Sequence, residues 1–115
     1  MNQSIYNLLV DAAKSRKIVT YSDLAGPLGL DLSNDSDRNS LTQFLREIAI
    51  YEQSCDRPML TSLVIHKSGN NDPGEGFFSI AKDLGLFDGS RRTEDRALFW
   101  VGQVSEAHKY WANSI

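Results

Sequence analysis

The sequence predicts a single α+β domain over residues 1–115, mostly helical, with a small β-hairpin or sheet and a long C-terminal helix. Three observations predict this fold class. Apolar residues recur at spacings of three and four in several segments, as in amphipathic helices. One short segment, residues 59–66, is apolar enough to form a buried strand. The chain has 115 residues and a mass of 12.9 kDa, which is the size of one domain.

Two helices are expected in the first part of the chain. The first is predicted over residues 4–16 because its apolar residues follow helical spacing: Ile5, Leu8, Leu9, Ala12 and Ala13. The second is a short helix over residues 20–28. It begins with a capping box, in which Thr20 is the N-cap and the side chain of Asp23 reaches back to the Thr20 amide. Glycine and proline at residues 26–29 end it.

A polar stretch leads into a third helix. Residues 31–40 are rich in Asp, Asn and Ser, which bond to their own backbone and are typical of a loop. The third helix is predicted over residues 38–52, again from apolar residues at spacings of three and four. The strand at 59–66 follows the helix-breaking pair Arg57 and Pro58.

Two structures are compatible with the glycine-rich region after the strand. Residues 68–76 contain the strongest turn signal in the chain. This turn either closes a hairpin with a strand over residues 77–80 or leads into a helix over residues 75–84. The last helix is predicted over residues 93–112. Its apolar face would comprise Ala97, Leu98, Val101, Val104, His108 and Trp111, with Phe99 and Trp100 widening it.

Composition and charge argue against several classes of protein. With 41% hydrophobic and 23% charged residues, the chain is neither disordered nor fibrous. It has no apolar run of the roughly 20 residues that span a bilayer. Its first residues lack the pattern of a signal peptide, so a cytoplasmic protein without membrane contact is expected. The net charge of −3 and the pI near 5.2 are unusual for a dedicated nucleic-acid-binding protein.

Few residues suggest catalysis or metal binding. The single cysteine, Cys55, excludes an internal disulfide and a Cys-rich zinc site. The phosphate-binding loop, the serine-hydrolase elbow and the zinc-protease motif are missing from the sequence. No cofactor or metal is expected, and the protein is predicted not to be an enzyme. An enzyme is the third hypothesis, and its only credible site would comprise His66, Asp72 and Glu75.

The order of the predicted elements matches that of a winged helix, in which the third helix enters the major groove and a β-turn contacts the phosphate backbone. Side chains that bond bases and phosphates occur on both elements here. The expected nucleic-acid-binding residues are Arg38, Asn39, Gln43 and Arg46 on the helix, with Lys67, Asn70 and Asn71 on the turn. Four carboxylates of the same region oppose a positive potential: Asp35, Asp37, Glu47 and Glu52.

One segment resembles a known DNA-binding domain. The stretch Val19-Thr-Tyr-Ser-Asp-Leu-Ala25 is similar to the start of the winged-helix domain in alkylguanine alkyltransferases and alkyltransferase-like proteins, where Thr-Tyr-Gly-x-Leu/Ile-Ala opens the helix-turn-helix. Residues 57–65 lie where that family has Pro-Cys-His-Arg-Val-Val, so the similarity covers residues 18–66. Met59 replaces the alkyl-accepting cysteine and the following His-Arg is absent. The resemblance therefore implies a fold and no alkyl transfer.

A second resemblance is to small uncharacterised bacterial proteins. These share an Arg-Pro-x-Leu-x-Ser-x-Val-Val pattern followed by Pro-Gly-x-Gly-Phe-Phe, which residues 57–64 and 73–78 resemble. This resemblance implies no particular activity.

These observations lead to two main hypotheses about function. The first is a small non-enzymatic bacterial binding protein with a winged-helix-like core that contacts nucleic acid or a DNA-bound complex. The second is an acidic inhibitor of the immunity-protein or antitoxin type, which masks the basic surface of a protein partner. The binding surface of the inhibitor would comprise Asp31, Asp35, Asp37, Asp72 and Glu75.

Overall fold

The computed structural model describes residues 1–66 and 73–113, so Lys67, Asn70, Asn71 and Asp72 lie outside the described residues. The elements in chain order are α1 (Gln3–Lys14), β1 (Val19–Thr20), α2 (Tyr21–Leu28), α3 (Asp35–Ser54), the 3₁₀ helix η1 (Leu60–Leu63), β2 (Val64–Ile65), α4 (Glu75–Asp83) and α5 (Thr93–Ala112). The predicted fold class, mostly helical α+β with a small sheet and a long C-terminal helix, is confirmed.

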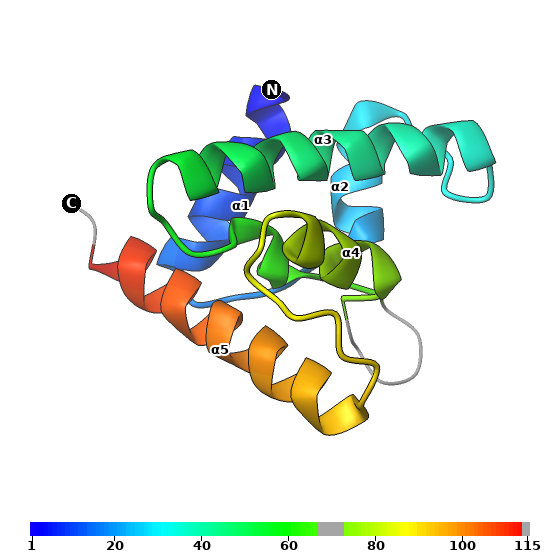
Figure 1. Cartoon of the computed structure of the whole chain (residues 1–115). Coiled ribbons are helices and arrows are strands. Elements are labelled where there is room, and N and C mark those ends of the chain that lie inside the picture. The colour runs from blue at the N-terminus through cyan, green and yellow to red at the C-terminus, as the bar shows by residue number, and fades with distance from the viewer. Residues whose placement is uncertain (67–72, 114–115) are drawn as a thin grey trace.

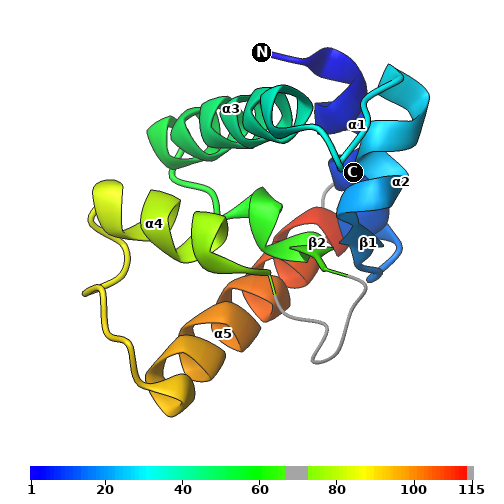
Figure 2. The same cartoon turned by 90° about the vertical axis from the view of Figure 1, so that its right-hand side faces the viewer.

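The helices surround η1, which lies near the middle of the molecule. Figure 1 shows α3 along one side and α5 along the other, with α4 between them. In the view of Figure 2, α4 lies on one side of η1, while α1 and α2 lie on the other. The two strands pair in parallel, Val19 with Val64 and Thr20 with Ile65, so the chain between them crosses over.

Side-chain caps explain where α1 and α2 begin. The Asn2 side chain accepts a hydrogen bond from the Ile5 amide at the start of α1. The predicted capping box of α2 is confirmed, since Thr20 and Asp23 each accept from the backbone amide of the other. Gly29, with φ of 69°, ends α2 in the left-handed conformation.

The predicted loop over residues 31–40 is wrong in its second half. Asn34 accepts a hydrogen bond from the Asp37 amide, and this cap starts α3 at Asp35. Asp35 and Asp37 therefore lie in the first turn of α3, where acidic side chains complement the helix dipole.

The predicted strand over residues 59–66 is also wrong for most of its length. Residues Leu60–Leu63 form η1, and only Val64 and Ile65 are extended. All four residues of η1 are buried, which an alternating strand with one covered face would not achieve. Contacts with α5 hold this turn, because the Met59 amide donates to Gln103 Oε1 and Trp100 Nε1 donates to the Ser62 carbonyl.

The region after Pro73 forms a helix, so the alternative of a hairpin strand over residues 77–80 is wrong. Phe77 and Phe78 of α4 are both buried, and Ile80 and Ala81 are buried one turn later. This helical burial pattern places α4 against the second of two hydrophobic clusters. The second cluster comprises Ala49, Met59, Phe77, Phe78, Ile80 and Ala81. The first is larger and contains α1, α2, α3 and η1 side chains.

The apolar face predicted for α5 is partly wrong. Leu98 is 74% exposed and Val101 is 57% exposed, whereas Ala107 is fully buried. The helix packs through the side that carries Trp100 and Gln103, since these residues bond to the η1 segment. None of the described helices is both long and apolar enough to cross a membrane.

Glu52 is buried, which corrects the expectation that it weakens a positive surface potential. Its side chain is fully covered and accepts a hydrogen bond from Arg57 Nε. The guanidinium carbon of Arg57 lies 5.3 Å from the ring centre of Tyr51 and 5.4 Å from that of Trp111. Burial and the neighbouring Glu52 carboxylate raise the pKa of Tyr6 above its usual value. Glu52 therefore pairs with Arg57 in the interior and contributes no negative charge to the surface of α3.

Candidate functional site

Three of the predicted nucleic-acid-binding residues form one row on the exposed side of α3. Asn39, Gln43 and Arg46 follow one another at spacings of four and three, so they share a helix face. We call these three residues the α3 row. Asn39 and Gln43 are exposed and line an open hollow of about 530 Å³. Arg46 Nη1 donates to Asp83 Oδ2 of α4 at 2.9 Å, so this guanidinium is held in place at the end of the row.

Arg38, the fourth predicted residue of the helix, lies outside this row. Its Nη1 donates to the Leu32 carbonyl at 2.7 Å, and its Nη2 pairs with Asp35. It lines a cleft between α2, α3 and the start of α4, with a volume of about 280 Å³. We call this the α2–α4 cleft, and its lining residues are Tyr21, Leu32, Arg38, Leu41, Thr42, His66 and Gly76.

A stacked pair of rings forms one wall of the α2–α4 cleft. The rings of Tyr21 and His66 are 4.4 Å apart between centres, with an angle of 29° between their planes. The Tyr21 hydroxyl donates to the Pro73 carbonyl at 2.7 Å. These contacts join the beginning of α2 to the segment before α4. In the sequence, only its place directly after the N-cap of α2 marks Tyr21, and helical spacing does not relate it to His66.

A second hollow lies between the first turns of α4 and α5. Its volume is about 580 Å³, and its lining includes Glu75, Phe78, Arg91, Thr93, Arg96 and Trp100. Arg96 donates to both oxygens of Glu75, at 2.6 and 3.1 Å, and lies over the Phe78 ring. These hydrogen bonds lower the pKa of the Glu75 carboxyl. Arg91 has no ion-pair partner within the described ranges, and sequence reasoning gave it no role.

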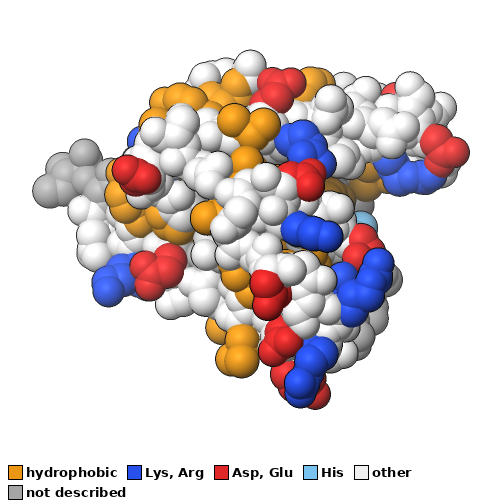
Figure 3. All heavy atoms as spheres, in the orientation of Figure 1, with side chains coloured by type: hydrophobic (Ala, Val, Ile, Leu, Met, Phe, Trp, Pro, Cys, Tyr) orange, Lys and Arg blue, Asp and Glu red, His pale blue; other side chains and the backbone are white. Residues whose placement is uncertain are grey.

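Basic side chains therefore gather at one end of the molecule. Figure 3 shows Lys and Arg side chains around a notch between the N-terminal end of α3 and the first turns of α4 and α5. Arg38 belongs to α3, while Arg91 and Arg96 come from the segment that leads into α5 and from α5 itself. Acidic side chains share this region, since Asp35 pairs with Arg38 and Glu75 with Arg96.

The carboxylates predicted for the inhibitor hypothesis bond within the fold. Asp31 accepts from the amide and the hydroxyl of Ser33, and these hydrogen bonds lower the pKa of its carboxyl. Asp37 accepts from the Asp31 amide at 2.8 Å. With Asp35 paired to Arg38, all three side chains shape the loop before α3. Glu75 lies at the start of α4, and Asp72 is outside the described residues.

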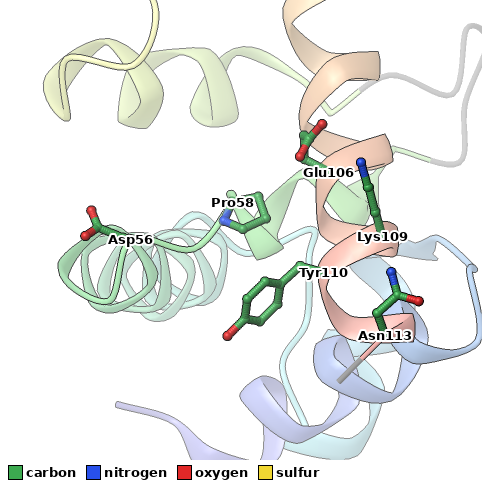
Figure 4. Close-up of a pocket in the computed structure, with 6 residues that line it drawn as sticks. All are labelled: Asp56, Pro58, Glu106, Lys109, Tyr110 and Asn113. Carbon is green, nitrogen blue, oxygen red and sulfur yellow. The ribbon is translucent and has the colours of Figure 1, made fainter. Parts of the chain in front are cut away.

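Another hollow, near the C-terminal half of α5, contains none of the predicted residues. Its volume is about 560 Å³, and Figure 4 shows the Tyr110 ring projecting from α5 toward the loop that carries Asp56 and Pro58. Two carboxylates, Asp56 and Glu106, line it together with Lys109. This mixture of charges favours no class of ligand. In the described part of the chain, no three His, Cys, Asp or Glu side chains are grouped as metal ligands.

Comparison of the chain with protein-family models, with curated proteins and with solved structures finds no match.

Proposed function

We propose that this protein binds nucleic acid, with Asn39 and Gln43 of the α3 row facing the bases and with Arg46 and the nearby Arg38 contacting phosphates. The observation that carries this proposal is the α3 row, because it presents two uncharged amide side chains and one guanidinium on the same exposed helix face. Asn and Gln bond to adenine edges and Arg bonds to guanine edges or phosphates. A helix of 20 residues is long enough to lie along a major groove.

The neighbouring charges support this assignment. Arg38 is fixed at the N-terminal end of α3 by the Leu32 carbonyl, so it is held in place before a ligand arrives. Arg46 is held at the other end of the row by Asp83. Glu52, which would have opposed an approaching phosphate, is buried and paired. Net charge remains −3, so the proposed affinity depends on this local arrangement and falls steeply with salt.

The proposal includes a winged-helix-like arrangement of the first half of the chain. Three helices occur in the expected order, and β1, between the first two, pairs with β2 after the third. The helix α4 takes the place expected for a hairpin strand, so phosphate contacts from a β-hairpin are not part of the proposal.

Binding to short labelled duplex and single-stranded DNA at low and moderate salt tests the proposal. We expect salt-sensitive binding in the micromolar range or tighter. The double variant Asn39→Ala/Gln43→Ala should weaken binding about tenfold or more, since each base contact contributes about 1–3 kcal/mol. Arg46→Gln should reduce the slope of log affinity against log salt concentration by about one, because one phosphate contact is lost.

Lys14→Gln is the matched control, because Lys14 is an exposed cation at the end of α1 and is not part of the α3 row. Its removal should leave affinity almost unchanged. Absence of binding at low salt would disprove the proposal. Capture of a basic protein in that case would favour the acidic inhibitor instead.

A further inference from the structure

We propose that the α2–α4 cleft binds one nucleotide unit, with the base inside the cleft and the phosphate at Arg38. The unit is either a free mononucleotide or an unpaired nucleotide of a strand. The second case rests on the proposed function, whereas the first can be tested without it.

A smaller hollow adjoins the α2–α4 cleft; we call the cleft as defined above the outer part and the smaller hollow the inner part. The outer part has a volume of about 280 Å³, close to the lower end of the range for small-molecule sites. A narrow inner part of about 20 Å³ shares Tyr21, Thr42 and Gly76 with it. The inner part has room for one atom of about the size of a water molecule. The shape therefore suits a small ring system that carries a polar substituent.

The walls of the outer part suit a planar base. Tyr21 and His66 form a stacked aromatic wall, and the hydrogen bond from Tyr21 to the Pro73 carbonyl holds it in position. Leu32 and Leu41 supply apolar surface. Contacts between a base and aromatic side chains contribute about 1–3 kcal/mol and tolerate all bases. We therefore expect little preference among bases from this wall.

Thr42 supplies a polar partner for the edge of a bound base, since it lines both parts of the cleft. Thr42 donates its hydroxyl to the Arg38 carbonyl and retains acceptor capacity toward the cleft.

Charge at the mouth of the cleft favours a phosphate there. The Arg38 side chain is half exposed, and its bonds to Leu32 and Asp35 leave other N–H groups of the guanidinium available. Asp35 is the carboxylate that competes for this arginine. A nucleotide combines the three required features, which are a planar ring, polar groups on the ring edge and an anionic group on a short arm.

Gly76 offers a variant that blocks the cleft and preserves the fold. It lines both parts of the cleft, and a Cβ placed on it meets no atom within 4 Å. It lies in the first turn of α4 with a φ outside the left-handed region, so the backbone accepts leucine there. Gly102 of α5 also has open space around its Cβ position, so Gly102→Leu is a matched control on another helix.

The experiment measures calorimetric binding of the four ribonucleoside 5′-monophosphates and of the corresponding nucleosides. We expect the wild-type protein and Gly102→Leu to bind the monophosphates equally, and Gly76→Leu to lose binding by more than about tenfold. Arg38→Gln should remove the preference for monophosphates over nucleosides. Thermal unfolding of each variant verifies that it folds.

A second arm uses single-stranded DNA with and without an abasic position. One outcome would overturn this inference and leave the proposed function standing. In that outcome, single strands bind, mononucleotides do not, and neither Gly76→Leu nor the abasic position changes the affinity for the strand. If mononucleotides bind and strands do not, the cleft is confirmed as a site for the free ligand and the proposed function fails. Equal loss of binding in Gly76→Leu and Gly102→Leu would also overturn the inference.

Discussion

At the scale of single residues, the interior pair of Glu52 and Arg57 has the largest expected effect on stability. Glu52 is fully buried, and Arg57 is 17% exposed between the rings of Tyr51 and Trp111. Arg57 Nη2 also donates to the Tyr6 hydroxyl at 3.3 Å. The pair thus connects the end of α3 to α1 and α5. A buried carboxylate depends on such a partner, because its desolvation is otherwise uncompensated.

Replacing Arg57 with methionine should therefore lower the free energy of unfolding by about 3–5 kcal/mol, since the Glu52 carboxylate loses its charged partner while remaining buried. Chemical denaturation monitored by circular dichroism measures the change.

Arg46→Gln is the control for this prediction. It breaks an ion pair whose members are 35% and 58% exposed, so the expected loss is at most about 1 kcal/mol. Equal losses in the two variants would contradict the assignment of Arg57 to an interior role.

At the scale of elements, the segment that leads into α4 controls the shape of the α2–α4 cleft. Gly74 is the N-cap of α4 and has φ of 80°, a conformation that side chains other than glycine rarely adopt. A Cβ at this position would lie 2.4 Å from His66 Nε2. The backbone of Gly74 therefore packs against the ring that stacks on Tyr21, and the aromatic wall depends on this glycine.

Gly74→Ala should destabilise the protein by about 1–3 kcal/mol, because it combines backbone strain with a clash against His66. Thermal or chemical unfolding measures the effect, and weaker nucleotide binding should accompany it.

Gly102→Ala provides the comparison on another helix. Gly102 lies in the interior of α5 and has open space around its Cβ position, so alanine there should stabilise the protein by about 0.5–1 kcal/mol. A stable Gly74→Ala protein would show that the turn before α4 does not require glycine.

At the scale of the whole molecule, the two hydrophobic clusters meet along the chain, because residues that are neighbours in the sequence belong to different clusters. Ile48 belongs to the first cluster and Ala49 to the second, and Leu60 and Met59 are divided in the same way. The helix α5 also contacts both clusters, through Ala107 in the first and through Phe99 and Trp100 in the second. This arrangement predicts one cooperative folding unit.

Leu9→Ala in the first cluster and Met59→Ala in the second should each lower the free energy of unfolding by about 2–5 kcal/mol. In both variants, circular dichroism and tryptophan fluorescence should report one shared transition. Separate transitions for the two probes, in either variant, would show that the clusters unfold independently.

Sequence reasoning was most accurate for local structure. The helical spacing predicted α1 and α5, the capping box predicted the start of α2, and both depend on neighbouring residues only. The α3 row was also predictable, because residues three and four apart on a helix share a face. The same reasoning failed for η1, whose apolar residues suit a strand until the hydrogen bonds from α5 are known.

Other features depend on contacts between segments that are distant in the sequence. The contact of Arg57 with Tyr6, the stacking of Tyr21 on His66 and the pairing of Glu75 with Arg96 join residues that no local pattern relates. Sequence by itself determined the helices and the side chains that α3 exposes, because helix periodicity and capping act within a few residues. Only the tertiary structure decided the α2–α4 cleft and which charges remain on the surface, because packing places each side chain beside partners from other elements.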